Sequence, residues 1–155
     1  MNTQRRNVLK AGSGAALMSL LAAAGIITPN IALADWNKAA FDAKSMADTL
    51  KALGVTATTD SNDVQVVAQD IAENGAVVPV GVTSTLPNVS MIAVLIEKNP
   101  NALAATFRLP EGTEANIHTR VKMGQTSNVY ALVKSGDKFF MATKEIKITL
   151  GGCGG

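Results

Sequence analysis

Short apolar runs separated by polar turns fill the chain from Asp63 onward, and much of this pattern has the period of two that is typical of β-strands. The clearest run, residues 89–96, is continuously apolar apart from one serine, which predicts a strand buried on both faces. Seven such strands at this spacing predict an antiparallel β-sandwich, with a β-barrel as the alternative. The other predicted strands are residues 64–67 with 70–72, 76–82, 104–109, 115–123, 128–134 and 138–150.

Three local features refine this prediction. Pro79 cannot donate a backbone hydrogen bond, which favours an edge or a bulge for its strand. Ser135-Gly136-Asp137 is typical of a hairpin turn between the last two strands. The final strand alternates strictly, so we expect one mostly apolar face to anchor it in the sheet as far as Leu150. That face consists of Phe140, Ala142, Lys144, Ile146, Ile148 and Leu150.

A helical pattern precedes the strands. Apolar residues recur at spacings of three and four between residues 36 and 53, and Gly54 follows as a plausible C-terminal stop. We interpret the segment as one helix that covers a side of the core, with docking of a partner as the alternative. Its expected apolar face is Trp36, Ala39, Ala43, Met46, Leu50 and Leu53.

Residues 1–34 have the composition of an export signal rather than of a folded domain. The paired Arg5 and Arg6 begin a basic head, a short apolar stretch follows, and Ala34 ends a small-residue cleavage motif. The arginine pair favours the twin-arginine (Tat) pathway, with a general secretory signal as the alternative. We therefore expect a periplasmic protein, without a membrane anchor once the signal is removed, whose folded domain spans residues 35–150.

The charge balance and the small number of metal-ligating residues argue against nucleic-acid binding and against a metal site. Residues 35–155 carry 11 basic and 12 acidic side chains, whereas nucleic-acid binding requires clustered Lys and Arg. A single histidine, His118, and a single cysteine cannot build a usual zinc site, and no cofactor motif is present. We interpret His118 as a solvated strand residue. Four carboxylates lack a calcium-loop spacing and are interpreted as surface charge: Asp60, Asp63, Asp70 and Glu73.

The remaining chemistry lies at the C-terminus. Cys153 is the only cysteine and stands between two glycine pairs, Gly151-Gly152 and Gly154-Gly155. Glycine leaves the backbone nearly unrestrained, so residues 151–155 are expected to form a flexible arm with an exposed thiol. Three residues beyond Leu150 extend the thiol by about 10 Å. No basic side chain lies within the last eight residues to stabilise the thiolate.

Three uses of this thiol follow from its chemistry. A nucleophilic pair with His118 is disfavoured, because a loose tether positions a catalytic group poorly. An odd thiol in an exported chain can form an intermolecular disulfide, which would make the protein a structural or interaction module with a Cys153-linked dimer. The interpretation we favour is a non-catalytic carrier, in which Cys153 is a covalent attachment point presented to the active sites of other proteins.

The chain resembles the SoxY family of sulfur-oxidation carrier proteins. The terminal Gly-Gly-Cys-Gly-Gly at residues 151–155 is the specific motif, and the twin-arginine signal agrees with it. Three internal segments support the resemblance: residues 72–80, 97–100 and 124–129, which read AENGAVVPV, EKNP and GQTSNV. Lys122-Met123 departs from the more arginine-rich, aliphatic sequence expected before the last segment, which puts no functional residue in doubt.

The resemblance implies an immunoglobulin-like β-sandwich that forms a heterodimer with a second sandwich protein, SoxZ. It implies that Cys153 holds sulfur intermediates covalently during oxidation of thiosulfate to sulfate. A haem protein, SoxAX, would join thiosulfate to the thiol, and a hydrolase, SoxB, would release sulfate. In some organisms a sulfane dehydrogenase would oxidise the persulfide that remains. The carrier itself would need no cofactor.

Overall fold

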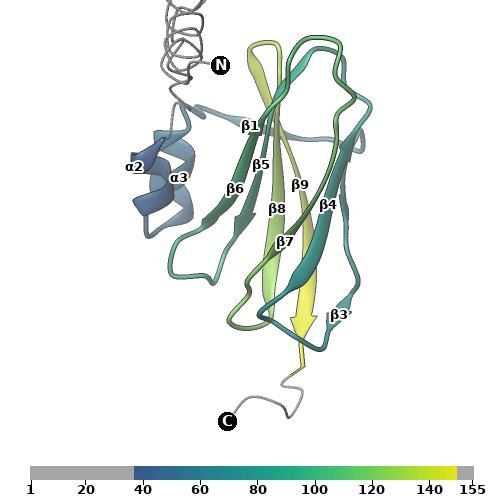
Figure 1. Ribbon diagram of the computed structural model, residues 1–155. Helices are drawn as coiled ribbons and strands as arrows, with labels where there is room; N and C mark the ends of the chain where they lie inside the picture. The colour runs from purple at the N-terminus through teal and green to yellow at the C-terminus, as the bar shows by residue number, and fades with distance from the viewer. Residues whose placement is uncertain (1–36, 150–155) are drawn as a thin grey trace, which may run out of the picture. The chain divides into compact units, whose positions relative to one another are not determined.

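The computed structural model describes residues 37–149, which fold into two short helices and nine strands (Figure 1). The predicted signal, residues 1–34, and the predicted arm, residues 151–155, lie outside the described residues. The helices are α2 (Lys38–Asp42) and α3 (Met46–Ala52). The strands are β1 (Thr58–Asp60), β2 (Val64–Val67), β3 (Ile71–Ala72), β4 (Val78–Ser84), β5 (Val89–Ile96), β6 (Leu103–Arg108), β7 (Asn116–Val121), β8 (Ser127–Ser135) and β9 (Lys138–Ile148).

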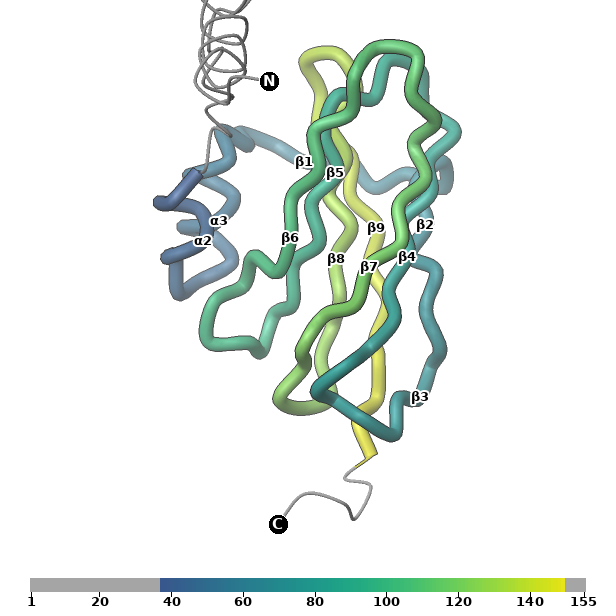
Figure 2. The backbone as a smooth tube through the Cα atoms, in the orientation of Figure 1, coloured from purple at the N-terminus to yellow at the C-terminus, as the bar shows by residue number. Residues whose placement is uncertain are grey.

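The strands form two sheets that face each other, which confirms the predicted immunoglobulin-like sandwich. The larger sheet has the order β1-β9-β8-β5-β6, with β3 added beside the end of β9, and the smaller has the order β2-β4-β7 (Figure 2). Because β-strands point alternate side chains to opposite faces, each sheet supplies one apolar face to the core. That core includes Val78, Val80, Val82, Ile92, Val94, Ile96, Val129, Val133 and Ile146.

β5 is buried on both faces, as its continuous apolar run predicts. Ile92 and Val94 pack in the core between the sheets, whereas Ala93 and Leu95 face a second apolar cluster. Leu50 and Leu53 of the helical segment pack against this second cluster. The two helices therefore cover the outer face of the larger sheet, and this explains why β5 carries no polar face.

The single predicted helix is wrong: the segment forms two helices with a break between them. Ala43 adopts an extended backbone with ψ of 135°, and Ser45 then caps α3 by accepting a hydrogen bond from the Asp48 N–H. Because Ser45 caps the start of α3, the chain leaves the helical conformation just before this residue and α2 does not continue into α3. In α2 the buried residue is Ala40, not the expected Ala39. The predicted stop is confirmed, since Gly54 has a positive φ of 76° directly after the C-cap residue.

Two parallel pairings depart from the expected purely antiparallel order. β1 and β3 both run parallel to β9, one beside its beginning and one beside its end. β1 is a polar three-residue strand and β3 has two residues, so neither carries enough pattern to predict its partner. The remaining pairs are antiparallel, including the predicted hairpin of β8 and β9 around Gly136.

Pro79 lies in a central strand, not in the edge strand that proline favours. β4 pairs with β2 on one side and β7 on the other, but the β2 ladder ends at the pair Val67 with Gly81. Pro79 pairs only with Arg120 of β7. Its missing N–H is tolerated because the opposite side of β4 has no strand partner at this position.

The predicted alternation of β9 is confirmed over the described residues. Phe140, Ala142, Ile146 and Ile148 pack against the core between the sheets, whereas Phe139 faces the second cluster. Leu150, the last predicted anchor, lies outside the described residues.

Neither α2 nor α3, the helices within residues 37–149, is long and apolar enough to cross a membrane.

Candidate functional site at the end of the final strand

The site residues predicted from the sequence fall outside the part of the chain that the structure describes. These are Cys153 with its glycines Gly151, Gly152, Gly154 and Gly155, the signal residues Arg5 and Arg6, and the cleavage residue Ala34. The structure does describe the surface that leads to Cys153, because β9 and Thr149 precede the arm directly. The candidate site is therefore the end of β9 and the loops that surround it.

Hydrogen bonds hold both edges of the β9 end. On one edge, the Lys147 N–H donates to the Asp70 carbonyl at 2.9 Å and the Thr149 N–H donates to the Ala72 carbonyl at 3.1 Å. On the other edge, the Ile148 N–H donates to Thr126 Oγ1 at 3.0 Å. The last described residues are thus fixed by two backbone carbonyl groups, one just before β3 and one within it, and by one hydroxyl group.

A glycine lets the neighbouring loop pass close to this strand end. The Met123 N–H donates to the Gly75 carbonyl at 2.7 Å. A Cβ on Gly75 would lie 2.4 Å from the Met123 carbonyl oxygen and 3.1 Å from Ile148 Cγ2. No side chain fits in this space, so the glycine is required by the close approach of two backbones beside Ile148.

A third loop is tied to the same region through an asparagine. Asn99 donates from Nδ2 to the Lys122 carbonyl at 2.7 Å, and its Oδ1 accepts from the Gly124 N–H at 3.4 Å. The Lys98 N–H donates to Ser127 Oγ at 3.0 Å. Residues 72–80, 97–100 and 124–129, which are far apart in the sequence, are therefore linked in one place by these bonds and by the Gly75 contact.

One ion pair on β9 involves the acidic residue that precedes β3. Lys144 Nζ lies 2.9 Å from Asp70 Oδ1 and also donates to the Ala68 carbonyl. The Lys144 hydrogen bond and charge, with a smaller contribution from Lys147, lower the pKa of Asp70 below its ordinary value of 3.8. Lys144 thereby joins β9 to the chain between β2 and β3, next to the strand end.

A row of basic side chains occupies the outer face of β7 and its continuation. His118, Arg120 and Lys122 are exposed, whereas the alternate residues Ile117 and Val121 are buried. Lys122 lies beside Met123, which contacts the Gly75 loop at the β9 end. The sequence near Cys153 lacks a basic residue, but the fold brings Lys122 and Lys147 to the strand end from which the arm departs.

His118 is exposed on β7, as predicted. Its ring lies across Gly81, where an added Cβ would be 2.7 Å from His118 Nδ1. The four carboxylates do not form one cluster: Asp63 accepts from Thr85 Oγ1 at 3.1 Å, and Asp70 pairs with Lys144. Within residues 37–149, no group of three His, Cys, Asp or Glu side chains could hold a metal ion.

Sequence reasoning missed Gly75, Thr126 and the basic row. The basic row could have been predicted from the sequence, because His118, Arg120 and Lys122 alternate with apolar residues that are buried in the structure. Gly75 and Thr126 lie within segments that resemble the SoxY family, but their roles depend on contacts with Ile148 that no local pattern shows.

Comparisons with known proteins bear directly on this site. The family model described as "Sulfur oxidation protein SoxY" matches residues 50–153, so the match extends through Cys153. The solved structure of the sulfur carrier protein SoxY from Chlorobium limicola f thiosulfatophilum is similar, with 29% identity and a TM-score of 0.63. That similarity covers 68% of this chain and 97% of the other. No curated protein sequence matches.

More distant structures share the fold alone. The superoxide reductase (neelaredoxin) from Ignicoccus hospitalis has a TM-score of 0.51 and 16% identity, covering 57% of this chain and 81% of that one. A variant of the same reductase gives a TM-score of 0.52 at 16% identity, covering 59% of this chain and 83% of that one. At this identity the similarity indicates a common sandwich and carries no argument about chemistry.

Proposed function

The chain belongs to the SoxY family, and from this premise we propose that it carries sulfur compounds covalently on Cys153 during thiosulfate oxidation. The observation that carries the proposal is that the family match runs through residue 153. The fixed end of β9 supports it, because Thr149 gives the arm a defined origin on a rigid sheet. The domain itself, residues 35–150, would act as a scaffold for the arm.

The proposed cycle needs two chemical steps, both supplied by partner enzymes. In the first, the Cys153 thiolate and the outer sulfur of thiosulfate form an S–S bond, and two electrons leave to the haem protein SoxAX. In the second, SoxB hydrolyses the terminal S–S bond with water, which releases sulfate and leaves a persulfide on Cys153. Covalent attachment retains the intermediate on the carrier between the two steps.

The glycine pairs have a specific task in this proposal. Gly151 and Gly152 remove side-chain bulk between the sheet and the thiol, so the arm can enter a narrow channel without clashes. Different enzymes then act on the same adduct in different pockets, including a sulfane dehydrogenase where one is present.

Replacement of the attachment residue tests the proposal. The wild-type chain, incubated with thiosulfate and the loading enzyme, should gain a thiosulfate-derived adduct on its C-terminal peptide in intact-mass measurements. Cys153→Ser should fold normally, as judged by circular dichroism, and gain no adduct. An adduct on the serine variant, or none on the wild type, would overturn the proposal.

We also propose that residues 1–34 direct export through the Tat pathway and that SoxZ travels as a folded passenger in a heterodimer. Tat export of a cofactor-free chain is explained if a partner without its own signal must cross with it. Replacement of Arg5 and Arg6 with lysine should leave both proteins in the cytoplasm. A partner that reaches the periplasm while the doubly substituted chain stays in the cytoplasm would contradict the passenger role, and export of the substituted chain itself would contradict the Tat pathway.

A further inference from the structure

The smaller sheet ends at β7, whose outer edge has no strand beside it. The order of this sheet is β2-β4-β7, and within residues 37–149 no strand pairs with β7 on the side away from β4. An edge of this kind presents unpaired backbone N–H and C=O groups, to which another extended chain can add as a further strand. The edge of β7 is therefore a candidate surface for strand addition.

The register of β4 with β7 fixes which backbone groups face this edge. At the end of β4 the Ser84 N–H donates to the Ala115 carbonyl at 2.8 Å. Hydrogen-bonded and non-bonded pairs alternate along an antiparallel ladder, so the pair of Gly81 with His118, three positions further on, is a non-bonded pair. Arg120, two residues beyond His118, occupies the same kind of position. The backbone N–H and C=O groups of both residues therefore point away from β4, toward the open edge.

Local contacts close this edge at its two ends. At one end the Asn116 N–H donates to the Glu114 carbonyl at 2.9 Å. At the other end Asn99 Nδ2 donates to the Lys122 carbonyl at 2.7 Å. The open stretch is thus limited to residues 117–121, which is the length of a short strand.

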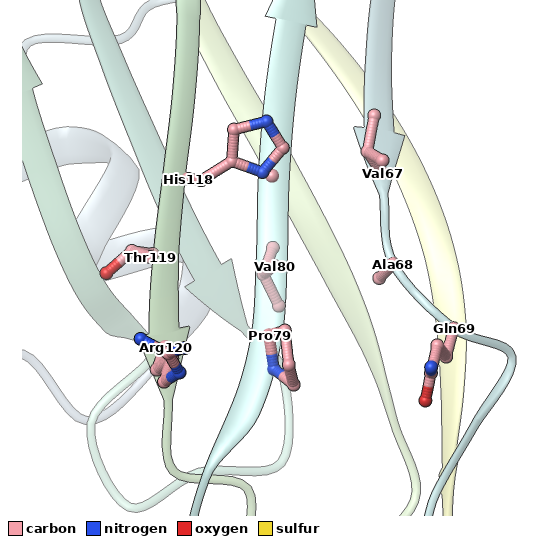
Figure 3. A pocket seen from close by; sticks show the side chains of 9 residues that line it. Val67, Ala68, Gln69, Pro79, Val80, His118, Thr119 and Arg120 are labelled. Carbon is pink, nitrogen blue, oxygen red and sulfur yellow. The ribbon is translucent and has the colours of Figure 1, made fainter.

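A groove on the outer face of the sheet lies beside the same stretch. After Val67 the chain leaves β4 and pairs with β9 as β3, so no strand covers this side of β4 at Pro79. The groove has a volume of about 450 Å³. Val67, which is 46% exposed, and Pro79 give it apolar surface, and its β7 side carries His118 and Arg120 (Figure 3). The open edge is therefore part of a larger surface that combines apolar and basic groups.

The basic side chains of this surface differ in their availability. The His118 ring lies across Gly81, where an added Cβ would be 2.7 Å from its Nδ1, so the ring is turned toward β4 (Figure 3). Within residues 37–149, no hydrogen bond or ion pair engages the Arg120 guanidinium, and Lys122 is exposed two positions further on. The residues that line the groove include no carboxylate. A guanidinium in these surroundings favours a carboxylate, to which it can donate two parallel hydrogen bonds.

We propose that β7 binds an extended acidic segment of a partner protein as an added antiparallel strand. Residues of the added strand opposite His118 and Arg120 would exchange backbone hydrogen bonds with them. Directly opposed side chains lie on the same face of a sheet, so a carboxylate opposite Arg120 would meet its guanidinium. A second carboxylate two residues away would reach Lys122. The residue between the two carboxylates would point inward beside the buried Val121, where an apolar side chain fits.

A second copy of this chain is a poor occupant of the same edge. It would bring its own basic row against the first, and like charges opposite each other destabilise a strand pair. Charge on an edge strand also discourages indiscriminate pairing. The basic row therefore selects an added strand by the sign of its charge.

The position of this edge gives the docking a use. Met123, directly after Lys122, donates its N–H to the Gly75 carbonyl at 2.7 Å, and Gly75 lies beside Ile148. A partner held on β7 would therefore be close to the β9 end from which the arm departs. The docking itself does not depend on what Cys153 carries.

The test follows the amides of the full chain by NMR during titration with a short synthetic peptide that alternates glutamate with valine. Binding should move the amide protons of His118 and Arg120 downfield, because these N–H groups gain an acceptor. The Thr119 amide already faces β4 and should move less. Two matched peptides should not bind: one has lysine in place of glutamate, and the other has N-methylated glutamate, which removes the backbone donors that would face β7.

Variants of the chain assign the charge. Arg120→Gln should weaken binding of the acidic peptide by about two- to fivefold, the effect of one exposed ion pair, and Arg120→Lys should retain most of the affinity. Lys51→Gln, on α3, is the matched control and should change nothing. Binding should also weaken as salt shortens the Debye length from about 30 Å at 0.01 M to about 3 Å at 1 M.

Four results would overturn the docking proposal. The acidic peptide could leave the His118 and Arg120 amides unmoved, or the lysine or N-methylated peptide could bind equally well. Equal shifts with sodium sulfate would reduce the surface to a simple anion site. Shifts of the same amides that grow with protein concentration, without peptide, would show that a second copy occupies the edge. None of these results bears on the loading of Cys153, so the docking proposal and the proposed function can fail separately.

Discussion

Thr149 donates its backbone N–H to the carbonyl of Ala72 at 3.1 Å, so the final described residue is hydrogen-bonded to the strand β3. The preceding residue, Ile148, is held from the other side by Thr126 Oγ1. These two bonds fix the point from which the arm begins. In the proposed carrier the position of this origin determines which surfaces Cys153 can reach.

Gly75→Ala should destabilise the end of β9. The added Cβ would lie 2.4 Å from the Met123 carbonyl oxygen, and so two backbones must move apart. We expect a loss of about 1–3 kcal/mol in the free energy of unfolding, measured by urea denaturation. Gly124→Ala is the matched control, since its Cβ meets nothing within 4 Å and its φ is not positive. Equal stability of the two variants would contradict the close-approach argument.

Thr126→Val should loosen the strand end without changing side-chain shape. The substitution removes the hydroxyl that accepts the Ile148 N–H at 3.0 Å, and an unsatisfied, partly buried donor costs about 1–3 kcal/mol. The Ile148 amide should exchange with solvent faster, whereas Thr143→Val, on the exposed middle of β9, should leave that rate unchanged. An Ile148 amide as protected as in the wild type would show that this hydroxyl is not the anchor.

The ion pair of Lys144 with Asp70 should make the free energy of unfolding depend slightly on pH in the acid range. The pair lowers the folded-state pKa of Asp70 below 3.8, so its stabilisation is present above the unfolded-state pKa. The stabilisation is lost as the pH falls through the lowered folded-state pKa. In Lys144→Gln the Asp70 carboxyl should titrate closer to 3.8, as followed by carbon-13 NMR. An unchanged Asp70 titration in this variant would contradict the role of Lys144.

Replacement of both Gly151 and Gly152 with leucine should separate loading from processing. The thiol stays present and should accept tetrathionate at the wild-type rate. Release of sulfate by SoxB should slow, because the bulkier arm enters a narrow channel less readily. Equal rates of sulfate release by the variant and the wild type would contradict the role proposed for Gly151 and Gly152.

The strands with long patterns could be predicted from the sequence, and the short ones could not. β5 and β9 carry eight and eleven residues whose apolar positions define their faces. β1 and β3 have three and two residues and depend on β9 for their existence. The helix break at Ala43 was missed because its apolar spacing suits a helix, whereas the Ser45 cap competes with that spacing locally.

The same distinction applies to the site. The lone thiol among glycines can be recognised in the sequence of the tail. The surroundings of the β9 end, in contrast, depend on contacts between segments that are far apart in the sequence. Gly75, Asn99 and Thr126 come from three separate segments, and only the folded chain links them near Ile148. The alternation of His118, Arg120 and Lys122 with apolar residues could be recognised in the sequence, although the contact of the next residue, Met123, with Gly75 beside the β9 end could not.

The mass of the native C-terminal peptide tests the central claim most directly. The protein would be purified without reductant from cells that oxidise thiosulfate, digested, and the peptide that contains Cys153 analysed by mass spectrometry. The carrier account predicts a population of peptides with sulfane, sulfonate or thiosulfonate additions on Cys153. A peptide found only as the free thiol, or only in a disulfide with another chain, would contradict it.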